Sequence, residues 1–262
     1  MTCDEKRFLG DVAQHEMTII RDDGLYRHIR FKRPGSSAYW FDILTWPSRL
    51  CISGDMGDYV FSRLPDMFEF FRREPNEKGA IPINPDYWGE KLVAISGRGR
   101  LPASIFRWDH KQFKKCVSSD VESYIEHRLT DPDSPYADLL KAAKRDLWEA
   151  VRDEVLGCDE DEFSAMTAIR DFSFDYECGG THWCDTRERM VPDMEHFCFQ
   201  DFYEHNCKQY DFSFLWILHA VVWGIQQYDA RKARPWYRLA ADQLRTRSPI
   251  WKRREILKTR TA

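Results

Sequence analysis

The sequence predicts an α+β protein, in which an N-terminal antiparallel β-sheet packs against a mainly helical remainder. Between residues 17 and 63, short β-branched and aromatic runs alternate with turns that contain Gly, Asp or Pro, as in a meander of strands. Beyond residue 64 the segments lengthen and take helical spacing. Residues 212–228 are apolar on nearly all sides, which predicts a central buried helix. The expected regions are a sheet region at 1–64, a helical region packed on it at 65–230, and a basic, aromatic-containing segment at 231–262.

Five strands are expected in the sheet region, at 17–20, 25–32, 38–44, 50–52 and 59–61. The second is the clearest, because large apolar and basic residues alternate from Tyr26 to Lys32. This period of two is typical of a strand with one buried face. Gly54 and Gly57 are expected to supply left-handed turn positions between the last two strands.

Helices are expected to follow at 65–71, 84–95, 109–129, 136–156, 160–170 and 212–228. The first opens with Pro65 and Asp66, which favour a first helical turn. The segment 160–170 is the weakest of the six. Residues 171–195 are expected to be irregular, or to carry one short strand at 172–174.

Composition indicates a folded protein rather than a disordered chain, because 15% of the 262 residues are aromatic. The longest apolar run, Phe212–Ile225, is too short to cross a bilayer, and the polar start shows no signal-peptide pattern. We therefore expect a cytoplasmic protein with no membrane partner. The eight cysteines then suggest reduced thiols or metal ligands rather than disulfides.

The charges are sorted along the chain. Residues 153–204 carry 15 Asp/Glu and three Lys/Arg, whereas residues 231–262 carry 11 Lys/Arg and two Asp/Glu. Such asymmetry indicates a polyanion partner, a basic protein partner, or contact between the two blocks of the same chain. The pattern also leaves self-association into a homo-oligomer open.

A run of cysteine and histidine between residues 178 and 207 is a candidate metal site. Zinc takes four thiolate or imidazole ligands, so zinc is the one cofactor that the sequence suggests. The spacing matches no zinc-finger pattern, and the alternative is a set of structural cysteines and surface histidines. The candidate ligands are Cys178, His182, Cys184, His196, Cys198, His205 and Cys207.

Carboxylates form a second candidate site, for Mg²⁺ or for acid–base chemistry. The members are Asp55 and Asp58, in the turn around Gly57, and Asp171, Asp175 and Glu177. The alternative is that they stabilise local turns. No nucleophile elbow, Walker loop, dinucleotide fingerprint or His-Glu-x-x-His motif occurs in the sequence, so no catalytic residue is assigned.

Basic residues interleaved with Trp236, Tyr237 and Trp251 form a third candidate, because such a segment can clamp phosphates and stack bases. The alternative is an amphipathic helix that covers the acidic residues of the same chain. The candidate nucleic-acid or phosphate contacts are Arg98, Arg100, Arg231, Lys232, Arg234, Lys252, Arg253 and Arg254.

The acidic block supplies a fourth candidate, a partner-binding face that imitates nucleic-acid phosphates. Its members are Asp159, Glu160, Asp161 and Glu162. The alternatives are a solvated face or a cap on the helix that follows, since carboxylates are favoured at helix N-termini.

Two segments of the sequence carry a family resemblance together. One is Thr45–Arg63, which continues to Met67–Phe71 and is extended by Ile83–Leu92, and the other is Trp223–Asp229. They resemble a family of uncharacterised proteins encoded by tailed phages and prophages. The resemblance covers about a third of the chain and brings no catalytic residues. It implies an accessory gene product that acts in the host bacterial cytoplasm, against host defence or on host nucleic-acid metabolism.

Together these features favour a non-enzymatic accessory protein that binds and inhibits a host protein, such as a component of anti-phage defence. The first alternative is a nucleic-acid-binding protein that uses the basic segment 231–262. The second is a metal-dependent hydrolase that acts on nucleotides.

Overall fold

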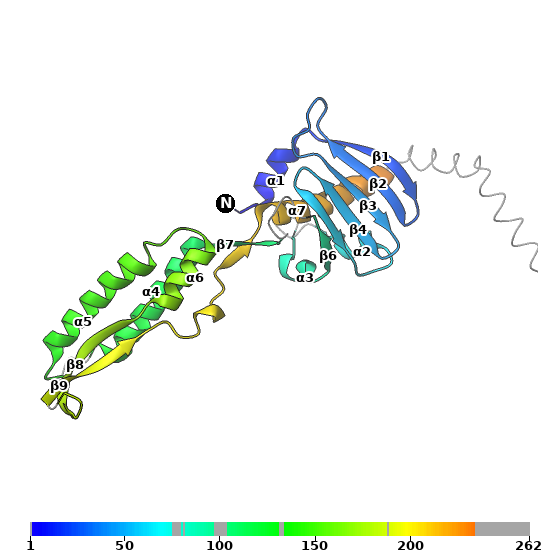
Figure 1. The fold of residues 1–262 in the computed structure, drawn as a ribbon. Coiled ribbons are helices and arrows are strands. Elements are labelled where there is room, and N and C mark those ends of the chain that lie inside the picture. Colours follow the sequence, from blue (N-terminus) through cyan, green and yellow to red (C-terminus); the bar gives the residue numbers. More distant parts are fainter. Residues whose placement is uncertain are drawn as a thin grey trace, which may run out of the picture. The chain divides into compact units, whose positions relative to one another are not determined.

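The computed structural model describes residues 2–74, 80, 82–96, 104–130, 134–187 and 189–233, and it confirms the α+β class (Figure 1). The chain forms two compact units. Unit 1 comprises Met1–Ile105 together with Tyr210–Ala262, and unit 2 comprises Phe106–Gln209. Unit 2 is therefore an insertion in unit 1, a division that differs from the expected boundaries after residues 64 and 230.

Unit 1 is built on a six-stranded antiparallel sheet in which each strand pairs with the next along the chain. Ile29, Ile43 and Ile52 are aligned across three neighbouring strands and are fully buried. The five expected strands are all present, and the sixth was not expected. The strands are β1 (Glu16–Asp23), β2 (Tyr26–Lys32), β3 (Phe41–Trp46), β4 (Arg49–Gly54), β5 (Gly57–Phe61) and β6 (Leu92–Ile95).

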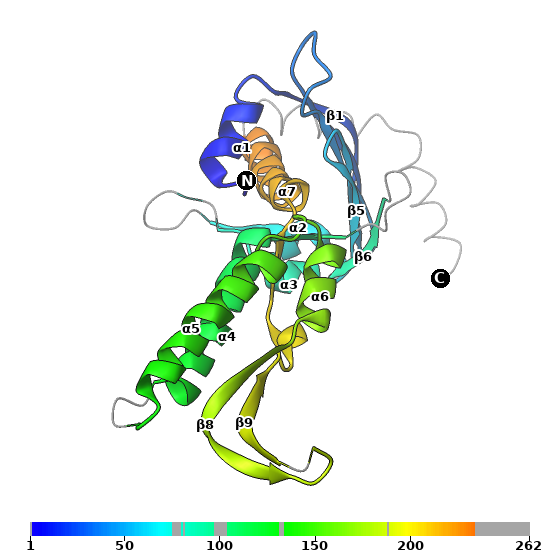
Figure 2. The same cartoon turned by 60° about the vertical axis from the view of Figure 1, so that its left-hand side comes forward.

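Helix α7 (Phe212–Ala233) is the buried helix expected near the end of the chain. It lies on the same side of the sheet as α1 (Glu5–Val12), as Figure 2 shows. A Cβ on Gly224 would lie 2.6 Å from Cδ1 of Ile43, so the helix backbone approaches the sheet more closely than a larger residue permits. The indole Nε1 of Trp216 donates to Asp11 at 3.1 Å and fastens α1 to α7.

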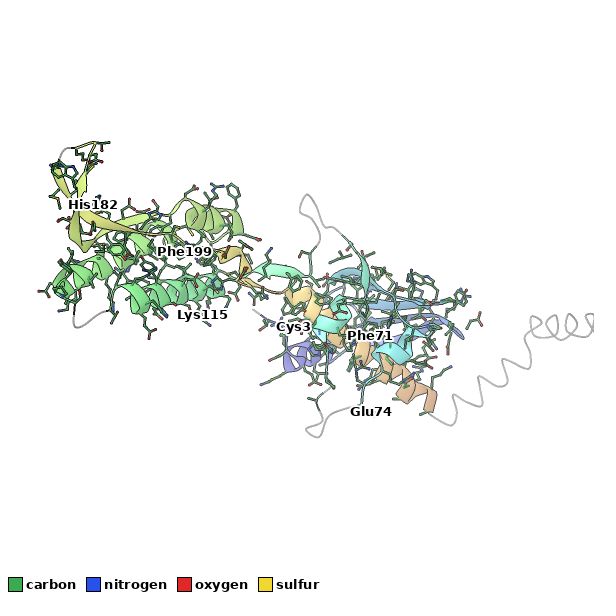
Figure 3. The ribbon with its side chains drawn as sticks, turned by 90° about the horizontal axis from the view of Figure 1, so that it is seen from below. Cys3, Phe71, Glu74, Lys115, His182 and Phe199 are labelled. Atoms are coloured by element: carbon green, nitrogen blue, oxygen red, sulfur yellow. The ribbon has the colours of Figure 1, made fainter. Side chains whose placement is uncertain are left out.

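Two short helices, α2 (Met67–Phe71) and α3 (Pro85–Gly89), complete unit 1. Asp66 caps α2 through the Phe68 N–H and also binds Arg27 with two hydrogen bonds of 2.8 Å. Phe71 is fully buried against the sheet (Figure 3). The expected helix 84–95 is wrong beyond Gly89, because Leu92–Ile95 pairs with β5 instead.

Three helices form the helical part of unit 2. They are α4 (His110–Arg128), α5 (Ala137–Ala150), which continues through a π-helical turn at Val151–Val155, and α6 (Glu162–Asp171). Asp109 caps α4 and Asp161 caps α6. These helices agree with the expected ranges to within a few residues. In the described part of the chain, no helix has both the length and the apolar character needed to span a bilayer.

The remaining large element of unit 2 is a long antiparallel hairpin formed by β8 (Phe174–Cys184) and β9 (Arg189–Phe197). The expectation that residues 171–195 are irregular is therefore wrong. Two further short strands, β7 (Phe106–Trp108) and β10 (Lys208–Tyr210), pair with each other. A 3-10 turn at Phe202–Glu204 lies between β9 and β10.

Candidate functional site

The hairpin of unit 2 bends at a bulge in β8. Its pairing register shifts between Glu177 and Thr181, where Gly179 and Gly180 have φ of 91° and 90°. Only glycine adopts such positive φ values without strain. The Tyr136 ring occupies the space where a Gly179 side chain would lie. Because bulges bend and twist a strand, these two glycines set the curvature of the hairpin (Figure 2).

The inner face of the hairpin packs on the helices of unit 2. Tyr176, Val191 and Phe197 are buried there. The Tyr176 hydroxyl lies 2.9 Å from that of Tyr124 on α4 and donates to Glu195 at 3.2 Å. Burial, followed by the hydrogen bond with Tyr124, raises the pKa of Tyr176 far above that of a free phenol.

The outer face of the hairpin is exposed along its whole length, although half of its residues are apolar. Trp183, Met190 and Met194 are 58%, 54% and 53% exposed. Because side chains alternate along a strand, these three residues share one face of the hairpin with their cross-strand partners. We call this set of eight residues the outer face, and its cross-strand pairs are Trp183–Met190, Thr181–Pro192, Glu177–Met194 and Asp175–His196.

Unit 2 is strongly acidic. It carries 24 Asp/Glu and 13 Lys/Arg, a net charge of −11, whereas unit 1 carries 19 and 26, a net charge of +7. The acidic excess therefore lies in one compact unit, whereas the basic excess counted for unit 1 comes from residues 234–262, which lie outside the described residues. Repulsion between like charges disfavours the approach of nucleic acid or of an anionic membrane to unit 2.

The seven candidate metal ligands do not converge on one point. Among the described residues, no three His, Cys, Asp or Glu side chains are grouped so that they could hold a metal ion. The hairpin explains part of the spread, because β8 and β9 place their Cys and His residues at different positions along the strands and on both faces. Cys198, His205 and Cys207 lie beyond the end of β9. The expected zinc site of Cys178, His182, Cys184, His196, Cys198, His205 and Cys207 is therefore not assembled in this structure.

Three of the four histidines after residue 180 instead pair with carboxylates. Nδ1 of His182 lies 2.6 Å from Asp193, and Nδ1 of His196 lies 2.7 Å from Asp175. These two contacts link the strands of the hairpin. His205 lies 2.9 Å from Oδ1 of Asp120 and joins the segment after β9 to α4.

The cysteines of the run occupy contrasting environments. Cys184 is hydrogen-bonded to the Thr186 hydroxyl at 3.2 Å, and this contact lowers the pKa of its thiol. Cys207 is buried beside Cys116, and burial raises the pKa of Cys207 to about 12. The Cys178 thiol donates to the Asp193 carbonyl at 3.3 Å, which is an ordinary structural role.

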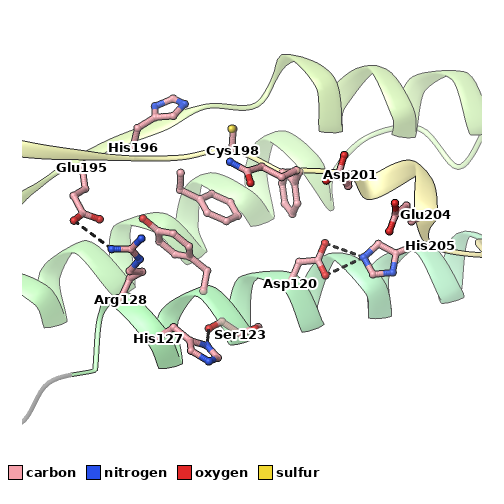
Figure 4. A pocket seen from close by; sticks show the side chains of 14 residues that line it. Asp120, Ser123, His127, Arg128, Glu195, His196, Cys198, Asp201, Glu204 and His205 are labelled. Carbon is pink, nitrogen blue, oxygen red and sulfur yellow. Dashed lines mark hydrogen bonds and ion pairs between the residues drawn. The ribbon is translucent and has the colours of Figure 1, made fainter.

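A pocket of about 590 Å³ lies in unit 2 between α4 and the chain that follows β9 (Figure 4). His205 and Asp120 line one end, and Arg128 lies 3.9 Å from Glu195 at the other. The carboxylate of Asp120 orients the His205 ring, as in an acid–base pair. Within the described residues, no serine or cysteine side chain is hydrogen-bonded to a histidine ring.

The acidic residues 159–162 differ in their surroundings. Asp161 accepts the Ser164 N–H at 2.9 Å, and hydrogen bonds to Ser164 lower the pKa of its carboxyl. Glu162 forms an ion pair with Lys208 at 2.7 Å. Asp159 and Glu160 are exposed and have no hydrogen-bond or ion-pair partner within the described residues. Helix capping thus explains Asp161, whereas Asp159 and Glu160 remain available to a partner.

The other carboxylate candidates are engaged locally, except Glu177, which is exposed on the outer face. Asp55 accepts the Tyr39 N–H at 2.8 Å, and Asp58 accepts the Ser53 hydroxyl at 2.6 Å. Asp171 is paired with its neighbour Arg170. These contacts agree with the alternative of turn and surface stabilisation, and they bring no second carboxylate to the same point.

Most of the basic candidates lie outside the described residues, namely Arg98, Arg100, Arg234, Lys252, Arg253 and Arg254. The other two, Arg231 and Lys232, lie in the last turn of α7. Lys232 binds Asp22 through its ammonium group, and Tyr228 donates to the same carboxylate at 2.8 Å. The Asp22 carboxylate thereby links β1 to the end of α7. In the described part of the chain, Lys232 therefore has a structural contact within unit 1.

The outer face was not anticipated from the sequence. The alternation of Met190, Pro192 and Met194 is a strand signal, but its apolar residues are the exposed ones. Asp193 and Glu195 alternate with them and point to the inner side, which reverses the usual pattern.

Comparison of the chain with family models, curated proteins and solved structures finds no match. We therefore infer function from the surfaces and charges of the chain itself.

Proposed function

We propose that the chain is a phage-encoded accessory protein that binds a host protein and inhibits it, with unit 2 as the binding unit. One observation carries the proposal: unit 2 is a compact, strongly acidic insertion with an exposed, partly apolar face. An exposed apolar face on a folded unit is typical of an interaction site. A component of anti-phage defence is the target class that the resemblance of residues 45–71, 83–92 and 223–229 favours.

Charge supports a protein target over nucleic acid. A net charge of −11 on unit 2 repels phosphates, whereas nucleic-acid-binding surfaces concentrate Lys and Arg. An acidic surface instead attracts a basic protein and increases its rate of association. Asp159 and Glu160 are two exposed members of this acidic surface that have no hydrogen-bond or ion-pair partner among the described residues.

Capture of the target followed by reconstitution tests the proposal. The tagged full chain is expressed in bacterial cells, the bound protein is identified and purified, and its activity is measured with increasing amounts of the chain. We expect one host protein, bound at a fixed ratio, whose activity falls as the chain is added. The Asp159→Asn/Glu160→Gln variant should associate more slowly at low salt, and this difference should vanish at high salt.

Two results would contradict this function. One is recovery of nucleic acid without a host protein, which would favour the nucleic-acid alternative. The other is a bound host protein whose activity is unchanged at saturation, which would make the chain a binder but not an inhibitor.

A further inference from the structure

We infer that the outer face of the hairpin is the docking surface of unit 2, and that it fits a basic protein surface with an apolar socket for Trp183. This inference rests on the proposed function, because it names the surface and the kind of partner through which that function operates.

The first argument is the placement of the apolar side chains. Trp183, Met190, Pro192 and Met194 are all exposed and lie on one face of the hairpin. Large apolar groups that gather on one exposed face of a folded protein mark interaction sites. Trp is the residue type most enriched among energetically dominant interface positions, and Met adapts its shape to a partner.

The second argument is that the backbone beneath this face is already ordered. The inner face is held by the buried Tyr176, Val191 and Phe197, and the curvature is set by Gly179 and Gly180. A surface that is fixed before binding loses little conformational entropy when a partner docks. The binding face is therefore preorganised, although it lies on a two-stranded sheet.

The third argument concerns how the partner docks. Addition of a partner strand to the hairpin edge would need a continuous row of backbone N–H and C=O groups. Pro192 in β9 has no N–H, and the bulge at Gly179 and Gly180 interrupts β8, so each edge carries a feature that discourages such pairing. Contact through the side chains of the outer face is therefore favoured over strand addition.

Charge complementarity indicates which kind of partner binds the outer face. The outer face itself carries Asp175 and Glu177, and the whole unit has a net charge of −11. A second copy of the same unit, a nucleic acid and an anionic lipid surface would all be repelled. A surface rich in Arg or Lys around an apolar socket would be attracted at the rim and desolvated at the centre, as in ordinary protein interfaces.

A matched pair of peptides tests the surface without knowledge of the natural target. The two peptides have equal length and identical leucine spacing, and they carry either Arg or Glu at every polar position. Each is labelled with fluorescein and titrated with the full chain, and binding is followed by anisotropy. We expect the Arg peptide to bind with an affinity that falls as salt rises, and the Glu peptide not to bind.

Variants locate the binding on the chain. Trp183→Ala should weaken binding of the Arg peptide about tenfold or more, because the substitution truncates the proposed anchor. Phe163→Ala is the matched control, since Phe163 is an aromatic residue of the same unit that is 80% exposed and not on the hairpin. Trp183→Phe should restore part of the affinity. Circular dichroism checks that each variant keeps its fold.

Several outcomes would overturn the inference. Equal binding of the Arg peptide by wild type and Trp183→Ala would mean attraction by net charge alone. The docking surface is also refuted if the Arg peptide does not bind, if the chain forms a dimer that is lost in Trp183→Ala, or if it prefers duplex DNA or phosphatidylcholine vesicles.

The two proposals fail separately. If a captured host protein binds wild type and Trp183→Ala equally, the outer face is not the docking surface but the proposed function stands. If binding of the Arg peptide depends on Trp183 and no host protein is inhibited, the outer face is still the docking surface, but the proposed function fails.

Discussion

Replacing Gly179 by alanine should destabilise unit 2, because the site forbids a side chain in two ways. The residue has a φ of 91°, and a Cβ would come closer than 3.0 Å to three atoms of the Tyr136 ring. A non-glycine residue held at such a φ costs about 1–3 kcal/mol. Forcing an atom into a packed ring contact costs about 1–3 kcal/mol more. We expect the free energy of unfolding to fall by about 3 kcal/mol. This fall is smaller than the two largest costs added together, because the half-exposed Tyr136 ring can shift.

Native-state hydrogen exchange is the assay, because it separates the two units within one sample. Amides of α5 and β8 should exchange faster in Gly179→Ala, whereas amides of β3 and α7 in unit 1 serve as the internal reference. The Gly179→Ala/Tyr136→Ala double variant removes the ring contact but not the unfavourable φ. The two changes should therefore be non-additive by about 1–3 kcal/mol. A loss below about 1 kcal/mol, or strict additivity, would refute the described geometry of the bulge.

Three further changes test other parts of the account. Burial would raise the pKa of Asp66, but hydrogen bonds from Arg27 outweigh burial and lower it, so this carboxylate stabilises the fold at neutral pH. In urea unfolding, the stability gap between wild type and Asp66→Asn should shrink as pH falls below about 4, and a constant gap would contradict the ion pair. Cys184 should be the first thiol alkylated by iodoacetamide, because the hydrogen bond with Thr186 lowers its pKa, whereas burial raises the pKa of Cys51 to about 11. Mass spectrometry of the labelled peptides shows the order of alkylation, and labelling of Cys51 before Cys184 would contradict this prediction. Tyr176→Phe should lower the free energy of unfolding by about 1 kcal/mol, measured by urea titration, and an unchanged stability would mean that the hydroxyl contacts contribute nothing.

Local patterns predicted the sheet of unit 1 and most helices well. The alternation from Tyr26 to Lys32 coincides with β2, and the apolar run beginning at Phe212 coincides with the start of α7. Gly57 has a φ of 107°, as its turn position suggested. Gly54 was misjudged, since it lies in β4 and is needed because a Cβ would lie 2.8 Å from Cα of Phe41.

The hairpin escaped prediction for a physical reason. The two glycines of the bulge interrupt the period of β8, and β9 exposes its methionines while it turns Asp193 and Glu195 inward. A pattern search assumes that apolar residues face the core, and a binding face violates that assumption. The same reversal that hid the strands therefore marks the surface.

The insertion of unit 2 was also beyond the reach of local patterns. The helix α7 follows unit 2 in the sequence, yet it packs with the core of unit 1 that begins at Cys3. Contacts of such long sequence separation leave no signal in neighbouring residues. The spread of the metal candidates has the same origin, because spacing along the chain does not reveal which face of a hairpin a side chain occupies.

The central claim is that unit 2 binds a basic protein partner through the outer face of its hairpin. Hydrogen–deuterium exchange of the full chain, alone and with the captured host protein, tests it most directly. The account predicts that protection on binding is concentrated in residues 174–184 and 189–197. Protection confined to peptides of unit 1, with the hairpin unchanged, would contradict it.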